Sequence, residues 1–128
     1  MICIDTSVII DAVSGRIETA RALRQAVEHG ERLAVSALVI YEWLRGPRSR
    51  PELDLQQSIL PAESALPFGP REAVVAAGLH REIAAARRRS MDLAIAATAI
   101  THDAMLWTLN VADFRDVPGL RLYEPSRS

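Results

Sequence analysis

The sequence has little that belongs to a secreted or membrane-bound protein. Cys3 is the only cysteine, so an intrachain disulfide is excluded, which fits a reducing compartment. The apolar segment at the start of the sequence is far too short to span a membrane, and it lacks the layout of a signal peptide. We therefore expect a cytoplasmic protein that does not associate with a membrane.

Lysine is absent, and all 15 basic residues are arginine. Together with abundant alanine, this bias is typical of GC-rich coding sequence, although arginine forks also suit the recognition of phosphate. The formal net charge of −1 argues against a protein that is coated in positive charge. It leaves nucleic-acid binding open, because a local basic patch is sufficient.

A length of 128 residues and a hydrophobic content of 49% predict one folded domain over residues 1–128. Strands are expected at 1–4, 33–35, 65–68, 104–108 and 120–123. Helices are expected at 7–13, 16–29, 37–45, 53–60, 70–86 and 91–101, with a loop at 48–51. This alternation predicts an α/β fold in which a parallel central sheet is flanked by helices on both faces.

Asp5 directly follows the first expected strand. A carboxylate in this position lies at the carboxyl edge of the sheet, where open α/β sheets bind their ligands. Three further acids recur in comparable positions, namely Glu42, Asp92 and Asp113. Carboxylates that converge on one point repel one another, which is tolerable mainly when a cation lies between them.

Each of the three later acids also has a purely structural interpretation. Glu42 stands in an almost wholly apolar helix, so it lies either at the rim of the core or against a ligand, because burying an unpaired carboxylate is costly. Asp92 is in the first turn of its helix, where acids complement the helix dipole. Asp113 follows a strand and could make local backbone bonds in a turn.

Four segments, taken in order, resemble the PIN domain, and in particular the VapC-type toxins of bacterial toxin–antitoxin pairs. They are 4–7 (IDTS), 36–42 (SALVIYE), 92–99 (DLAIAATA) and 108–114 (TLNVADF). Each segment alone is weak evidence. Four in the family's order, spanning nearly the whole chain, are specific.

The resemblance implies hydrolysis of RNA phosphodiesters at an acidic pocket that binds Mg²⁺ or Mn²⁺. The catalytic, metal-binding quartet implied by position is Asp5, Glu42, Asp92 and Asp113. The polar residues implied to support it are Thr6, Ser7, Thr108 and Asn110. Ser7 and Leu109 depart from the residues that many relatives carry, which bears on substrate preference more than on activity.

The resemblance also implies two macromolecular partners, an RNA substrate and a cognate antitoxin protein. Four arginines that flank the acids are candidates for RNA contacts, although they also fit a solvated surface or an antitoxin contact: Arg45, Arg87, Arg88 and Arg89. Helices 16–29 and 37–45 could form a groove for an amphipathic segment of the antitoxin, unless Tyr41 and Trp43 fill the core instead. We also expect a homodimer.

Other functions stay open at this point. A phosphatase with an aspartate nucleophile usually carries a second Asp two residues later, where this chain has Ser7. A non-toxin PIN nuclease in RNA processing would share the whole pattern. A catalytically inactive domain that binds RNA or protein would share the fold, but the intact acidic quartet argues against it.

Overall fold

The computed structural model describes residues 1–125, and the expected α/β architecture is confirmed. The strands are β1 (Ile2–Ile4), β2 (Leu33–Ala34) and β3 (Met105–Trp107). The helices are α1 (Thr6–Val13), α2 (Ile17–Glu28), α3 (Ala37–Arg45), α4 (Arg50–Ile59), α5 (Pro70–Glu82) and α6 (Ser90–Thr101). Three short 3-10 turns are η1 (Ala62–Ser64), η2 (Ala86–Arg89) and η3 (Val111–Asp113). Within this part of the chain, no helix has the length and hydrophobicity of a membrane span.

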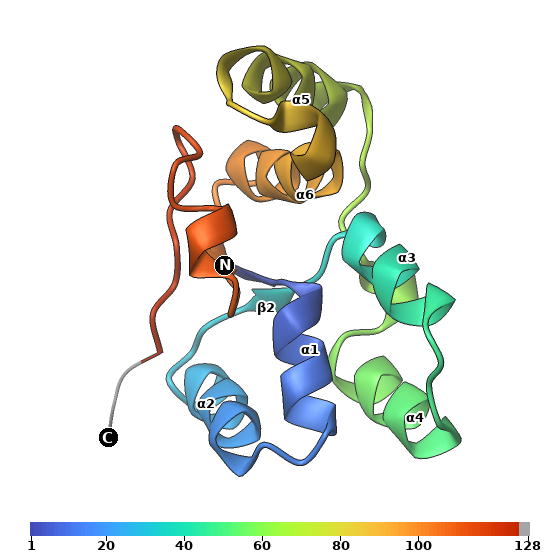
Figure 1. Cartoon of the computed structure of the whole chain (residues 1–128). Coiled ribbons are helices and arrows are strands. Elements are labelled where there is room, and N and C mark those ends of the chain that lie inside the picture. Colours follow the sequence, from blue (N-terminus) through green and yellow to red (C-terminus); the bar gives the residue numbers. More distant parts are fainter. Residues whose placement is uncertain (126–128) are drawn as a thin grey trace.

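The sheet is parallel, and β1 is its central strand. The strand order is β2-β1-β3, with Cys3 opposite both Ala34 and Leu106. Figure 1 shows α5 and α6 on one side of the sheet and α1, α2 and α4 on the other. A parallel sheet that is covered on both faces needs strands that are apolar throughout, and all three residues of β1 are buried.

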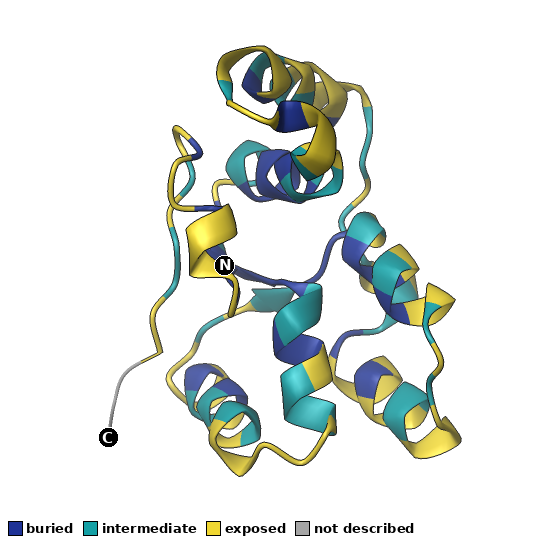
Figure 2. Cartoon of the chain, in the orientation of Figure 1, coloured by how far each residue is buried: buried dark blue, intermediate teal, exposed yellow. Residues whose placement is uncertain are grey.

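The core is continuous through the described residues and is centred on β1 and α6. Figure 2 shows that α6 is mostly buried or half-buried, whereas α5, which packs on it, is largely exposed. Trp43, Trp107 and Phe114 are the largest fully buried side chains. One core agrees with the single domain expected over 1–128, which stays a prediction because residues 126–128 lie outside the described residues.

Two expected strands are wrong, because each makes only one bridge. The segment expected at 65–68 pairs through Leu66 with Ser36, and Pro67 then removes the next backbone donor. The segment expected at 120–123 pairs through Leu122 with Leu106, and Pro125 follows two residues after the last bond, from Tyr123.

Local interactions explain three helix boundaries, of which two differ from expectation and one confirms it. Residues 50 and 51 are helical rather than loop, because Ser49 and Glu52 form a capping box at the start of α4. Helix α5 ends at Glu82 instead of residue 86, since Ile83 is extended and Ala85 has a φ of +57°. Helix α3 begins as expected, with the Ser36 hydroxyl accepting from the Val39 N–H at 3.1 Å.

Candidate active site

The parallel pairing of β1 and β3 brings Asp5 beside Thr108, as expected for residues at the carboxyl ends of neighbouring strands. The Asp5 N–H donates to the Trp107 carbonyl at 2.9 Å. The Thr108 and Ser7 hydroxyls both donate to Oδ2 of Asp5, at 2.7 and 2.9 Å. The Asp5 residue is only 5% exposed, and no hydrogen bond within residues 1–125 reaches its other oxygen, Oδ1. One oxygen is therefore fixed by two hydroxyls, and the other accepts no hydrogen bond within residues 1–125.

The two hydroxyls that hold Asp5 also hold the turn after β3. The Ser7 hydroxyl accepts from the Leu109 N–H at 3.0 Å, and the Thr108 hydroxyl accepts from the Asn110 N–H at 3.0 Å. Ser7 thus links the first turn of α1 to a segment about a hundred residues later in the sequence. Of the four expected supporting residues, Asn110 acts here through its backbone N–H.

Glu42 is held beside Asp5 by the fourth supporting residue. The Thr6 hydroxyl donates to Oε1 of Glu42 at 2.8 Å, and Thr6 directly follows Asp5 in the chain. The Arg45 guanidinium lies 3.9 Å from Oε2, while the Glu42 side chain keeps an exposed fraction of 21%. Glu42 therefore faces a site at the rim of the core, and it is only weakly paired with Arg45.

Asp92 connects all four acids electrostatically. It is half-buried in the first turn of α6, and burial is the first cause that raises its pKa, to about 6. The negative charges of three other residues raise this pKa further: Asp5, Asp113 and Glu42. The four acids come from four separate segments, yet the charges of three of them act on the carboxyl of the fourth. They therefore converge, with Asp113 on the exposed turn η3.

The acids converge without forming a closed cage. Within the described residues, no group of three His, Cys, Asp or Glu side chains is arranged to hold a metal ion. Mg²⁺ is usually held by one or two carboxylates and keeps several waters, so it does not require such a cage. Oδ1 of Asp5, which accepts no hydrogen bond within residues 1–125, and the carboxylates that act on Asp92 fit a hydrated hard cation better than a fully dehydrated one.

Arg89 is engaged inside the protein, although the sequence made it a candidate RNA contact. Its guanidinium bonds both carboxylate oxygens of Asp116, at 2.6 and 2.9 Å, and donates to the Asp113 carbonyl at 2.8 Å. No local pattern in the sequence indicates this pair, because the two residues are 27 positions apart. Arg87 and Arg88 are exposed, and Arg45 lies over the Tyr41 ring.

The chain is similar to proteins of one family over nearly its whole length. Residues 2–120 match the PIN domain. Ribonuclease VapC19 of Mycobacterium tuberculosis is 34% identical over 125 residues, which cover 92% of this chain and 95% of the relative. Ribonuclease VapC1 of Rickettsia felis is also 34% identical, over 93% of this chain and 92% of its own length.

Solved structures have the same fold. A toxin–antitoxin complex from Klebsiella pneumoniae superposes with a TM-score of 0.73 at 25% identity, covering 100% of both chains. DNA-bound VapBC from Salmonella typhimurium gives a TM-score of 0.78 at 20% identity, covering 98% of each chain. The sequence match covers all four acidic positions, and the structural match covers the strands and helices that carry them. The chain therefore belongs to the PIN domain family.

Proposed function

We propose that this chain is a metal-dependent endoribonuclease and the toxin of a toxin–antitoxin pair. The observation that carries the proposal is the convergence of Asp5, Glu42 and Asp113 on Asp92, because the charges of these three residues raise the pKa of the Asp92 carboxyl. The relatives that share a third of their residues with this chain are named as ribonucleases. The similar solved structures include toxin–antitoxin complexes, which supports an antitoxin as the partner.

The proposed roles follow from how each side chain is held. Asp5 would hold the divalent cation through Oδ1, because Ser7 and Thr108 fix Oδ2 and prevent rotation of the carboxylate. Glu42 is oriented by Thr6, and Asp92 and Asp113 complete the negative field. A bound divalent ion would supply an activated water and would offset the charge that develops on the phosphate.

Divalent metal should stabilise the protein more at pH 7.5 than at pH 5. Because the folded pKa of Asp92 is raised from 3.8 to about 6, Asp92 is ionised and repelled by its neighbours at pH 7.5, whereas at pH 5 a proton competes with the metal. At ten times its dissociation constant, Mg²⁺ should raise the melting temperature by about 5 °C at pH 7.5. Thermal melts at both pH values measure the difference.

The matched variant for this experiment is Asp92→Asn. It removes the like charge, so it should melt at a higher temperature than the parent chain without metal at pH 7.5. It should also lose most of the shift caused by Mg²⁺. Equal Mg²⁺ shifts at both pH values, in the parent and in the variant, would contradict a metal site at Asp92.

Exposed arginines near the site are proposed to bind RNA phosphates. Arg87 and Arg88 lie just before α6, and Arg45 lies beside Glu42. For the Arg87→Ala, Arg88→Ala double variant, the slope of log binding constant against log salt should flatten by about 1.4, because two fewer phosphates are neutralised. RNA binding titrations at several salt concentrations measure this slope, with Asp5→Asn present in every variant so that the RNA is not cleaved. Arg21→Ala on α2 is the control. An unchanged slope in the double variant would mean that Arg87 and Arg88 do not contact RNA phosphates and belong to a solvated surface.

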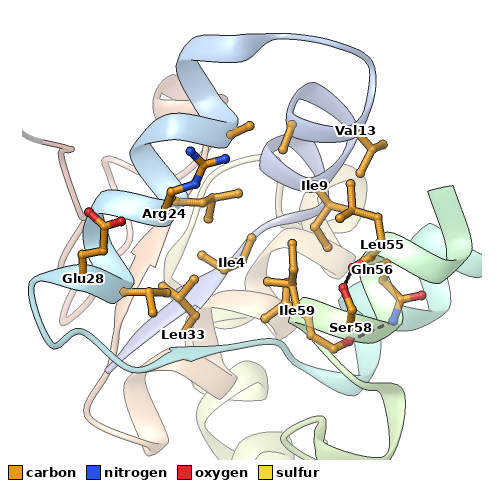
Figure 3. A pocket seen from close by; sticks show the side chains of 15 residues that line it. Ile4, Ile9, Val13, Arg24, Glu28, Leu33, Leu55, Gln56, Ser58 and Ile59 are labelled. Atoms are coloured by element: carbon orange, nitrogen blue, oxygen red, sulfur yellow. Dashed lines mark hydrogen bonds between the residues drawn. The ribbon is translucent and has the colours of Figure 1, made fainter. Parts of the chain in front are cut away.

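The surface proposed for the antitoxin is an apolar groove of about 610 Å³ between α1, α2 and α4. Figure 3 shows Ile9 and Val13 facing Leu55 and Ile59, with Arg24 and Glu28 at the rim. The sequence instead predicts an antitoxin groove between α2 and α3, which stays a prediction, and the groove of about 610 Å³ is a different surface. Among the described residues, no side chain of α3 lines it. Trp43 instead fills the core, while Tyr41 is exposed.

Cleavage of a short single-stranded RNA by the purified chain tests the proposed function. We expect cleavage with Mg²⁺ or Mn²⁺ and none in chelator. Equal cleavage in chelator would contradict the metal mechanism. Expression without an antitoxin distinguishes a toxin, which arrests growth, from a nuclease of RNA processing, which does not. The expected homodimer and cytoplasmic location stay predictions.

A further inference from the structure

Arg89 lies close in the chain to Asp92 and hydrogen-bonds the backbone of Asp113, although it is not one of the four acids. It occupies the N-cap position of α6, three residues before Asp92, and its side chain makes no capping bond to that helix. Its guanidinium forms a two-pronged ion pair with Asp116, and the same Nη2 donates to the Asp113 carbonyl. The side chain is largely buried, with an exposed fraction of 18%. A planar fork with several charge-assisted bonds fixes direction as well as distance.

The turn that carries Asp113 needs such an anchor. Turn η3 is exposed along its whole length, has no side-chain cap, and is closed locally by backbone bonds such as Asp113 N–H to the Asn110 carbonyl at 2.9 Å. Phe114 is buried and holds the C-terminal end of the turn in the core. Arg89, the last residue of η2, donates a side-chain hydrogen bond to the Asp113 carbonyl of this turn.

We propose that Arg89 and Asp116 form a positioning pair that fixes Asp113 relative to Asp92 at the spacing that a divalent metal requires. This inference rests on the proposed metal-dependent function. Neither residue is proposed to touch metal or substrate. Asp116 holds the guanidinium in place, and the guanidinium holds the Asp113 backbone. If η3 were loose, the Asp113 side chain would adopt many orientations. Ordering it when metal binds would cost conformational entropy and would weaken metal binding.

Charge alone predicts the opposite effect on metal binding. The positive charge of Arg89 lowers the cost of ionising its acidic neighbours, but it also repels a cation that approaches them. If Arg89 acted only as a nearby charge, its removal would tighten metal binding. If it acts by positioning, its removal weakens metal binding. The direction of the change therefore separates the two roles.

The experiment is Mn²⁺ binding to the full chain, measured by isothermal titration calorimetry. Arg89→Lys keeps the charge and loses the fork. The Arg89→Ala, Asp116→Ala double variant keeps the net charge and removes both groups. Each should bind Mn²⁺ about tenfold more weakly, as for other residues that orient ligands. The control is Arg115→Ala, which removes an exposed charge from the same loop and should bind at least as tightly as the parent chain.

Variants that bind Mn²⁺ as tightly as the parent chain would overturn the positioning role while leaving the proposed function intact. A parent chain that binds no Mn²⁺ would overturn both. Circular dichroism melts check that each variant is folded. If the double variant does not fold, Arg89→Lys decides the question, because it retains the charge and most of the volume of the side chain.

Discussion

Replacing Asp5 by Asn should reduce RNA cleavage more than about a hundredfold and leave the protein folded. Residues that only orient metal ligands cost about ten- to a hundredfold when changed, so a direct ligand should cost more. Asn has the shape of Asp, and its carbonyl oxygen can still accept from Ser7 and Thr108 in place of Oδ2. The change therefore removes a buried charge rather than the local structure, and cleavage rates at saturating Mg²⁺ measure its effect.

The matched control is Asp54→Asn on α4. The Asp54 side chain is 66% exposed and, within residues 1–125, forms an ion pair with Arg50 one turn away, so the same chemical change there should alter neither cleavage nor melting temperature. Folded Asp5→Asn that cuts RNA as fast as the parent chain would remove Asp5 from the mechanism. Loss of cleavage in both variants would mean that the assay reports stability instead of chemistry.

Residues that directly follow a strand or stand at the start of a helix could be placed correctly from the sequence. Asp5 follows a short apolar segment that is typical of a buried strand, and Ser36 precedes an apolar helix that it caps. The position of Asp92 in the first turn of α6 was evident for the same reason. These assignments depend on local patterns, and parallel pairing then brings the strand ends to one edge.

Contacts between distant segments could not be placed in this way. The bond from Arg89 to Asp116 depends on how η3 folds back against α6, and nothing in either segment's pattern encodes it. The Ser7 hydroxyl accepts from Leu109 for a similar reason, since the strand register decides which backbone N–H it meets. The three consecutive arginines cannot be told apart in the sequence. In the structure, Arg87 and Arg88 are exposed, whereas the Arg89 side chain is only 18% exposed.

Helix α4 lines the groove with residues that lie within the helix expected at 53–60, but its packing against α1 could not be predicted from the sequence. The capping box of Ser49 and Glu52 lies in a polar, proline-containing segment that resembles a loop, so α4 was expected to be shorter by three residues at its start. In the structure Trp43 is turned into the core, and α4 supplies the second wall through Leu55 and Ile59.

Replacing Ile59 by Arg should leave an active toxin that its antitoxin no longer neutralises. Ile59 lines the groove and is 47% exposed, so the free protein can hold an arginine there in water. An apolar antitoxin segment seated in the groove would bury that charge without a partner, at a cost of several kcal/mol, which weakens the complex more than about a hundredfold. Growth during co-expression and recovery of the complex measure the loss.

The Val74→Arg change on α5 is the control, because Val74 is 73% exposed and lies outside the groove. The acids of the proposed catalytic quartet are also absent from the groove lining, so RNA cleavage by the free Ile59→Arg protein should equal that of the parent chain. Cells that express Ile59→Arg should therefore stop growing with or without the antitoxin. Full rescue of this variant by the antitoxin would mean that the antitoxin does not bind in this groove. Loss of rescue for Val74→Arg would indicate that the antitoxin binds at α5.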